Sequence, residues 1–365
     1  MKPHNFSAGP AALPALALER AQAEFLSLND SGLSVLEISH RSQAFVDILQ
    51  QTEARLRDLL AVPEGYHILF LQGGASLQFA MLPMNFLHQK AGYVDCGSWA
   101  KKALAEARIQ GNAEVLWSDS EAGYRRMPTA EEWSQWQSQS LDYIHITSNE
   151  TIQGVALQQD LPRGKVPVFC DMSSDILSRP VDVSQYDVIY AGAQKNMGPA
   201  GVTVVIIKDE LLKTAREKLP TMLDYRTHVS KNSAYNTPPV FAIYMLNQVT
   251  QWLQEQGGLN AMYRHNQQQA SAVYNVLDQY PDFYRGHATP EYRSLMNITF
   301  TLPTHELEAQ FLAAAEAEGL LSLKGHRSVG GIRASIYNAC PQESVQALVE
   351  FLQRFYRSVH ARLPA

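Results

Sequence analysis

The feature that most constrains the fold is a regular alternation of short apolar runs with stretches of helical spacing. The runs are rich in Val, Ile, Phe and Tyr, and they cover residues 67–71, 92–95, 113–117, 143–147, 166–170, 187–190 and 202–207. Helical spacing is clear over residues 45–60, where the apolar side chains recur on one face. Strands that alternate with helices form a mostly parallel sheet covered on both faces. The sequence therefore predicts an α/β fold around a mostly parallel seven-stranded sheet.

The pattern changes near Gly257 and Gly258, which interrupt the chain. Beyond them, helical stretches over residues 259–280, 304–317 and 343–359 alternate with strands near residues 295–301, 321 and 333. This order is typical of a smaller α+β domain. We expect a large domain over residues 16–257 and a small domain made of residues 1–15 and 258–365.

Charge and cysteine content exclude several classes of protein. A net charge of -6 and an isoelectric point near 6.0 argue against a nucleic-acid-binding surface. The three cysteines are few and odd in number, so they do not suggest a disulfide scaffold. Their low number fits a reducing compartment. The apolar stretch at residues 11–18 is short and broken by Pro14, unlike a signal peptide, and no run is long enough to span a membrane. We expect a cytoplasmic protein with no membrane, nucleic-acid or metal partner.

Two strand ends carry side chains that suit covalent chemistry. Lys195 follows the run at residues 187–190, and Asp171 follows the run at residues 166–170. Ligands of parallel sheets bind at these carboxyl ends. A poorly solvated Lys at a strand end can attack a carbonyl group. With a buried Asp it provides what a pyridoxal phosphate enzyme needs, namely a Schiff-base amine and a carboxylate that keeps the pyridine nitrogen protonated. A solvated loop lysine is the commoner alternative, and the pair alone leaves it open.

Three further strand ends carry residues that suit a ligand. Gly73 and Gly74 permit a tight turn that directs the amides of the next helix towards an anion, although a plain strand–helix turn also uses glycine. Trp99 offers a flat face to an aromatic ring, or packs in the core. Thr151 supplies a hydroxyl group that can equally cap a helix.

The remaining candidates are polar and basic. Residues 236–239 (Asn-Thr-Pro-Pro) precede a helix and either bind a ligand or only cap that helix. Arg333, beside glycines in a strand of the small domain, can bind a carboxylate with two parallel hydrogen bonds. The pairs at residues 40–41 and 326–327, both His-Arg, are either surface basic pairs or ligands of a phosphate or side-chain carboxylate.

Taken in order, these motifs resemble the phosphoserine aminotransferase family, class V pyridoxal phosphate enzymes of fold type I. The resemblance covers nearly the whole chain and rests on residues 5–14, 37–41, 72–76, 171–174, 193–196, 236–239 and 330–335. It implies a large domain with a seven-stranded sheet and a smaller α+β domain. Seven motifs in one order are far more specific than any one of them.

The resemblance implies a role for each cofactor residue. Lys195 would form the Schiff base with pyridoxal 5'-phosphate and shuttle the proton between substrate and cofactor. Asp171 would pair with the pyridinium nitrogen. The other expected contacts are stacking by Trp99, a hydrogen bond near the phenolic oxygen from Thr151, and phosphate binding by Ala75, Ser76 and Gln194.

The substrate residues and the assembly are implied in the same way. Asn236 and Thr237 would reach the cofactor phosphate from the neighbouring subunit, so a homodimer with shared active sites is expected. Arg333 would bind the substrate α-carboxylate. The distal phosphate or γ-carboxylate would be surrounded by His40, Arg41, His326 and Arg327, some of them across the dimer interface. Ser76 departs from the arginine found there in some members, which leaves open the set of basic residues that binds the substrate phosphate.

The implied reaction is reversible, ping-pong transfer of the amino group from L-glutamate to 3-phosphohydroxypyruvate, which gives O-phospho-L-serine and 2-oxoglutarate. It would serve serine biosynthesis and, in some bacteria, pyridoxine biosynthesis. Rival interpretations are an alanine–glyoxylate-type aminotransferase, a cysteine desulfurase, and a non-catalytic anion-binding protein in which Lys195 is only structural. The desulfurase needs a reactive loop cysteine, and the surroundings of Cys340 do not resemble that loop.

Overall fold

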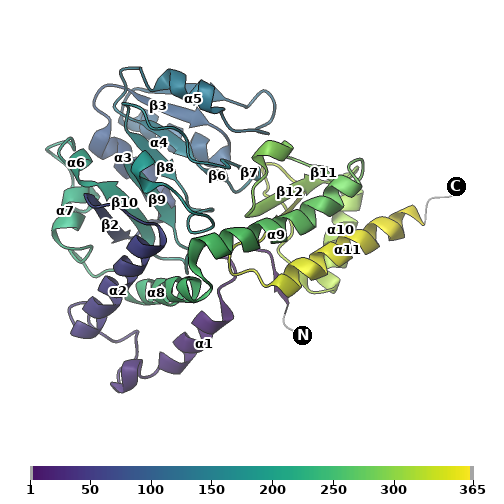
Figure 1. Cartoon of the computed structure of the whole chain (residues 1–365), viewed down its shortest axis with the longest axis horizontal. Helices are drawn as coiled ribbons and strands as arrows, with labels where there is room; N and C mark the ends of the chain where they lie inside the picture. The colour runs from purple at the N-terminus through teal and green to yellow at the C-terminus, as the bar shows by residue number, and fades with distance from the viewer. Residues whose placement is uncertain (1–2, 362–365) are drawn as a thin grey trace.

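The computed structural model describes residues 3–361, and its centre is a seven-stranded sheet (Figure 1). The strand order is β2-β10-β9-β8-β5-β3-β4. The strands are β2 (Tyr66–Leu71), β3 (Ala91–Asp95), β4 (Ala113–Ser118), β5 (Ile144–Thr147), β8 (Val168–Asp171), β9 (Val188–Gly192) and β10 (Thr203–Lys208). Only β10 runs antiparallel to its neighbours. The predicted α/β fold and its mostly parallel sheet are confirmed.

Helices cover both faces of this sheet (Figure 1). One face packs against α2 (Gln43–Leu59), α5 (Ala130–Trp136) and α8 (Val240–Glu255), and the other against α3 (Gly74–Phe86) and α4 (Ser98–Gln110). Strand β10 shows the reason for its unbroken apolar run, because Val204 and Ile206 enter one core while Val205 and Ile207 enter the other. The remaining helices near the sheet are α1 (Ala15–Glu24), α6 (Asp209–Leu212) and α7 (Tyr225–Ser230).

A second set of elements, here called the small unit, forms its own core. Its sheet has the order β11 (Arg285–Gly286), β12 (Asn297–Thr301), β14 (Ile332–Ser335), and its helices are α9 (Gly258–Gln279), α10 (His305–Ala317) and α11 (Gln342–His360). Helix α9 extends from the large sheet region into this unit (Figure 1). The N-terminal segment joins it through β1 (His4–Asn5), which pairs with β13 (Leu320–Leu321). Two separate cores support the expected division, whose boundaries stay a prediction.

The connection between β5 and β8 contains an unpredicted hairpin. Its strands are β6 (Asn149–Glu150) and β7 (Val155–Ala156), and both are buried. The backbone carbonyl of Gly154 accepts a hydrogen bond from the Ser294 amide at 3.0 Å, which ties the hairpin to the small unit. The hairpin therefore places residue 151 between the large sheet and the small unit. None of the helices within residues 3–361 is long and apolar enough to cross a membrane.

Candidate active site

The centre of the site is the side chain of Lys195, which follows β9 in a tight turn. Its Nζ donates a hydrogen bond to Thr151 Oγ1 at 2.7 Å and lies 4.9 Å from the centre of the Trp99 ring. The N-terminal segment crosses the same turn, because the Ala11 amide donates to the Gln194 carbonyl at 2.9 Å. Groups from three strand ends therefore surround one amine, as the sequence predicted.

Burial lowers the pKa of Lys195, and the nearby positive charge of Arg333 lowers it further. The carboxylates of Asp171 and Glu150 oppose this shift. A lower pKa increases the fraction of neutral amine at a given pH, and the neutral amine is the form that attacks a carbonyl. The environment of Lys195 therefore suits a nucleophile that also carries a proton.

Asp171 is the last residue of β8 and is only 4% exposed. Its Oδ1 accepts a hydrogen bond from the Ser173 amide at 2.9 Å. Burial raises the pKa of Asp171, and the charge of Lys195 counteracts that rise. A buried carboxylate of this kind is best satisfied by a cationic N–H group, which a protonated pyridine ring would supply.

Trp99 is held by an acidic residue that the sequence did not single out. Glu150, fully buried, accepts hydrogen bonds from the backbone amides of Trp99 and Ala100 at the start of α4, at distances of 2.8–3.1 Å. Gly97 leaves the room it needs, since a Cβ there would lie 2.5 Å from the Glu150 carboxyl carbon. Burial outweighs these amides and raises the pKa of Glu150 to about 7. In the sequence, this acid looks like any surface glutamate.

The start of α3 forms a second part of the site. Gly73 and Gly74 adopt left-handed conformations with φ of 89° and 65°, which favour glycine, and no side chain caps the helix. The first amides of a helix, here those of Ala75 and Ser76, have no carbonyl partner within it. They therefore form a site for an anion.

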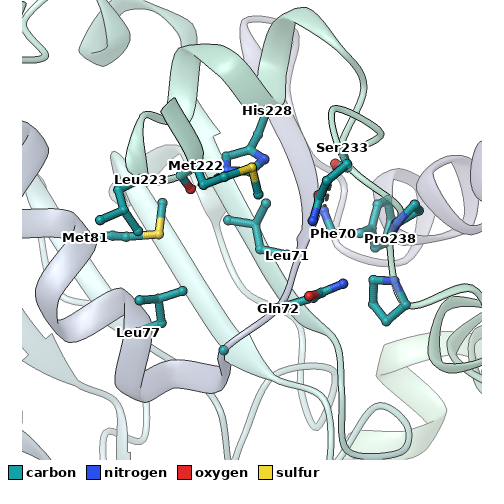
Figure 2. Close-up of a pocket in the computed structure, with 13 residues that line it drawn as sticks. Phe70, Leu71, Gln72, Leu77, Met81, Met222, Leu223, His228, Ser233 and Pro238 are labelled. Carbon is teal, nitrogen blue, oxygen red and sulfur yellow. Dashed lines mark hydrogen bonds between the residues drawn. The ribbon is translucent and has the colours of Figure 1, made fainter. Parts of the chain in front are cut away.

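The loop that carries Asn236 and Thr237 lies beside this helix start. Gln72 Nε2 donates to the Thr237 carbonyl at 3.2 Å. Figure 2 shows the adjoining hollow of about 310 Å³, in which side chains from β2, α3 and the segment after α7 face one another. Asn236 and Gly73 both line it. Within one chain, this loop thus borders the helix start that was predicted to bind a phosphate.

Arg333 approaches the centre from the small unit. It lies in β14, is half-buried, and its Nη1 donates to the Thr151 carbonyl at 3.5 Å. Burial lowers its pKa. Burial lowers the pKa of His326, and the positive charges of Arg333, Lys102 and Arg327 lower it further, so His326 lies within electrostatic reach of all three.

Two predicted residues do not join this group within the chain. His40 is half-buried and Arg41 is exposed, on the loop between α1 and α2. Among residues 3–361, no hydrogen bond or ion pair connects either side chain to Lys195 or Arg333. Their predicted role thus depends on a second copy of the chain.

Cys340 does not behave as a reactive thiol. It is buried, and burial raises its pKa to about 12, so almost none is ionised near neutral pH. Cys96 and Cys170 are buried as well, and burial raises the pKa of both. These environments argue against a desulfurase.

The donor groups fit a flat, phosphorylated aldehyde such as pyridoxal phosphate. The structure offers an amine with a lowered pKa, a buried carboxylate, an aromatic face and free helix amides. In addition, Trp99 Nε1 is buried and has no hydrogen-bond partner among residues 3–361, so it is available to a ligand.

Known proteins resemble this chain over nearly its whole length. The family described as aminotransferase class-V matches residues 4–348. Phosphoserine aminotransferase of Geobacillus kaustophilus is 54% identical over 97% of this chain and 98% of its own length. Among solved structures, phosphoserine aminotransferase from Bacillus circulans subsp. alkalophilus superimposes with a TM-score of 0.95 at 52% identity, over 98% of this chain and 99% of the other. Pyridoxal phosphate-bound phosphoserine aminotransferase from Trichomonas vaginalis superimposes with a TM-score of 0.91 at 41% identity, over 96% of this chain and 100% of the other.

Proposed function

This chain belongs to the phosphoserine aminotransferases of class V, which are pyridoxal phosphate-dependent transaminases, and from that premise we propose that it transfers the amino group reversibly from L-glutamate to 3-phosphohydroxypyruvate. The products are O-phospho-L-serine and 2-oxoglutarate. The observation that carries the proposal is the Lys195 amine, bonded to Thr151 and set against Trp99 beside the buried Asp171. The reaction is ping-pong, in a cytoplasmic enzyme that serves serine and, in some hosts, pyridoxine biosynthesis.

The chain's own residues would hold the cofactor at both ends of its ring. When bound, pyridoxal phosphate supplies an aldehyde that takes up an amino group and a ring that accepts electrons. Asp171 would pair with the ring nitrogen, Trp99 would stack on the ring, and the Thr151 hydroxyl would bond near the phenolic oxygen. Ala75 and Ser76 at the start of α3, together with Gln194, would hold the phosphate.

Lys195 carries the proton-transfer step. With the cofactor bound, its Nζ would accept the proton from the substrate α-carbon and hold it for return later in the reaction. The lowered pKa of Lys195 suits both directions, because the neutral amine takes a proton and the ammonium form gives one. Thr151 keeps the amine oriented through the 2.7 Å hydrogen bond.

Arg333 would orient both substrates through the α-carboxylate that they share. A bidentate arginine–carboxylate pair fixes direction as well as position. The far end, a γ-carboxylate in glutamate and a phosphate in phosphoserine, then lies among His326, Arg327, and His40 and Arg41 of a second copy.

The homodimer itself is part of the proposal. Helix α1 and the segment between α1 and α2 expose several large apolar side chains, with exposures between 41% and 80%, namely Leu18, Phe25, Leu26, Leu33 and Leu36. A row of exposed leucines beside the His40–Arg41 pair is typical of a surface that another chain covers. A second copy packed there would bring that pair towards its partner's site, and Asn236 and Thr237 towards its partner's phosphate.

The experiment is a spectral titration of the holoenzyme, reconstituted with pyridoxal phosphate. We expect L-glutamate and O-phospho-L-serine to convert the visible band of the bound cofactor, and L-alanine and L-cysteine to leave it nearly unchanged. Conversion by alanine but not by phosphoserine would contradict the proposed substrates. Absence of the band, together with no borohydride-trapped adduct on Lys195, would contradict the transaminase chemistry.

A further inference from the structure

Four basic side chains, close enough for their charges to interact, have no acidic partner. They are Lys102 of α4 and three residues of the small unit, His326, Arg327 and Arg333. The charges of the other three lower the pKa of His326, which places them all within electrostatic reach of its ring. Within residues 3–361, none of the four forms an ion pair with a carboxylate; His326 bonds to Ser328, and Arg333 only to a carbonyl group. Uncompensated positive charge of this kind favours a bound anion.

Lys102 is the member of this group with no assigned role. It lies one helical turn after Trp99, and its Nζ is 4.1 Å from the centre of the Trp99 ring. The amine of Lys195 lies 4.9 Å from the same ring centre. One tryptophan therefore has contacts with the central amine and with Lys102, which places Lys102 at the mouth of the same site rather than on a remote surface.

The preceding residue provides the contrast. Lys101 is also exposed and also lies over an aromatic ring, but that ring is Tyr124, at 4.6 Å. The Tyr124 hydroxyl donates to Asp95 at 3.0 Å, and the same tyrosine and acid raise the pKa of Lys101. The charge of Lys101 is therefore compensated by its own surroundings, whereas Lys102 contacts the Trp99 ring and has no carboxylate partner within residues 3–361.

We propose that Lys102 is a further substrate-binding residue, which contacts the distal anionic group and favours a phosphate over a carboxylate there. The proposal rests on the function proposed above. The two amino donors share an α-carboxylate, so they differ in charge only at the far end, where phosphoserine carries close to two negative charges and glutamate carries one. Coulomb attraction scales with the product of the charges, so a lysine at this position strengthens phosphate binding more. Lysine also binds phosphate well as a point charge that needs no fixed planar geometry.

The test compares Lys102→Met with the matched control Lys101→Met in the holoenzyme. The cofactor band is titrated with O-phospho-L-serine and separately with L-glutamate. We expect Lys102→Met to raise the half-saturating concentration of phosphoserine about tenfold, the size typical of one hydrogen bond to a charged group, and that of glutamate, which carries half the charge at its far end, only about threefold. Lys101→Met should change neither, and Lys102→Arg should restore most of the phosphoserine affinity.

Each outcome decides the proposal. An equal rise for both donors would mean that Lys102 serves the shared α-carboxylate and would overturn the selectivity. No rise for either donor would overturn the contact altogether. Added KCl should weaken the preference of the unmodified enzyme for phosphoserine more than that of Lys102→Met. If the unmodified enzyme itself fails to respond to phosphoserine, the proposed function fails, and that result is seen before any variant is compared.

Discussion

The two sides of the candidate site are built in opposite ways. On the side of the large sheet, Asp171, Thr151 and Glu150 are each no more than 4% exposed, and all three have hydrogen-bond partners. On the side of the small unit, Arg327 is exposed and has no carboxylate partner within residues 3–361, and the same holds for Lys102 of α4.

This difference separates chemistry from recognition. The groups that would move a proton are fixed before any substrate arrives, because strand ends and a buried hairpin hold them. The basic groups that would bind the substrate's distal anion have no carboxylate partner, so their positive charges are available to a negatively charged ligand. A substitution in the buried part should therefore reduce turnover, whereas one in the basic part should reduce affinity.

The largest effect is expected for Lys195→Ala, which removes the amine from the buried part. We expect kcat/KM with L-glutamate to fall by at least about 10³-fold, in line with the loss of a positioned proton-transfer group. Thr151→Ser, which keeps the hydroxyl group bonded to this amine, is the matched control and should stay within about tenfold. Retention of most activity by Lys195→Ala, with an unchanged melting temperature, would contradict the assignment.

Asp171→Asn tests the same part with the side-chain shape preserved. We expect kcat to fall by roughly 10²-fold, comparable to the loss of one preorganised electrostatic group, while the half-saturating concentration of phosphoserine changes little. The Asp171 carboxylate opposes the lowering of the Lys195 pKa, so a neutral amide in its place should lower that pKa further. A change confined to substrate affinity would contradict this assignment, because Asp171 would then act in substrate binding and not in the chemical step.

Arg333→Gln is expected to weaken the binding of both amino donors. The half-saturating concentrations of L-glutamate and O-phospho-L-serine should both rise about tenfold to 100-fold, because both lose a charged hydrogen-bond partner at the α-carboxylate. The cofactor band should remain unchanged. Equal effects on the two donors distinguish this residue from Lys102, whose substitution should affect phosphoserine more than glutamate.

The sequence predicted most of the buried part, for a physical reason. Seven apolar runs locate seven strands, and parallel strands bring their carboxyl ends to one edge, so Asp171 and Lys195 had to lie near each other. Gly73 and Gly74 were likewise readable, because their left-handed conformations favour glycine.

The rest depends on tertiary contacts without a local signal. Glu150 is fully buried only because a hairpin between β5 and β8 folds under α4, and its residue type alone suggests a surface position. Lys101 and Lys102 are indistinguishable by composition, yet one is compensated by Tyr124 and Asp95 and the other is not. The position of His40 and Arg41 relative to a site depends on a second chain, which no pattern within one chain specifies.

The smallest change in turnover is expected for Glu150→Gln. This substitution tests how much the burial of the Glu150 carboxylate lowers the free energy of unfolding when the group is ionised. Burial raises the pKa of Glu150 to about 7 from 4.5, so the folded protein binds its proton more tightly than the unfolded chain. Stability from this group is therefore present at low pH and falls as pH rises from about 4.5 to about 7. Gln cannot ionise, so the unfolding free energy of Glu150→Gln, relative to the unmodified protein, should increase by about 2 kcal/mol between pH 5 and pH 8.

The control is Glu132→Gln, at another helix start. Hydrogen bonds from Arg126 lower the pKa of Glu132 to about 2, so its contribution to stability is lost only as pH falls below about 4.5. Its effect on the unfolding free energy should therefore be constant from pH 5 to pH 8, as measured by urea denaturation at each pH. If Glu150→Gln were equally constant, Glu150 would be ionised throughout this range, and the buried part would hold a stable negative charge beside Lys195. Its carboxylate would then hold the Lys195 pKa up at every pH in the range, and turnover in Glu150→Gln would shift to lower pH.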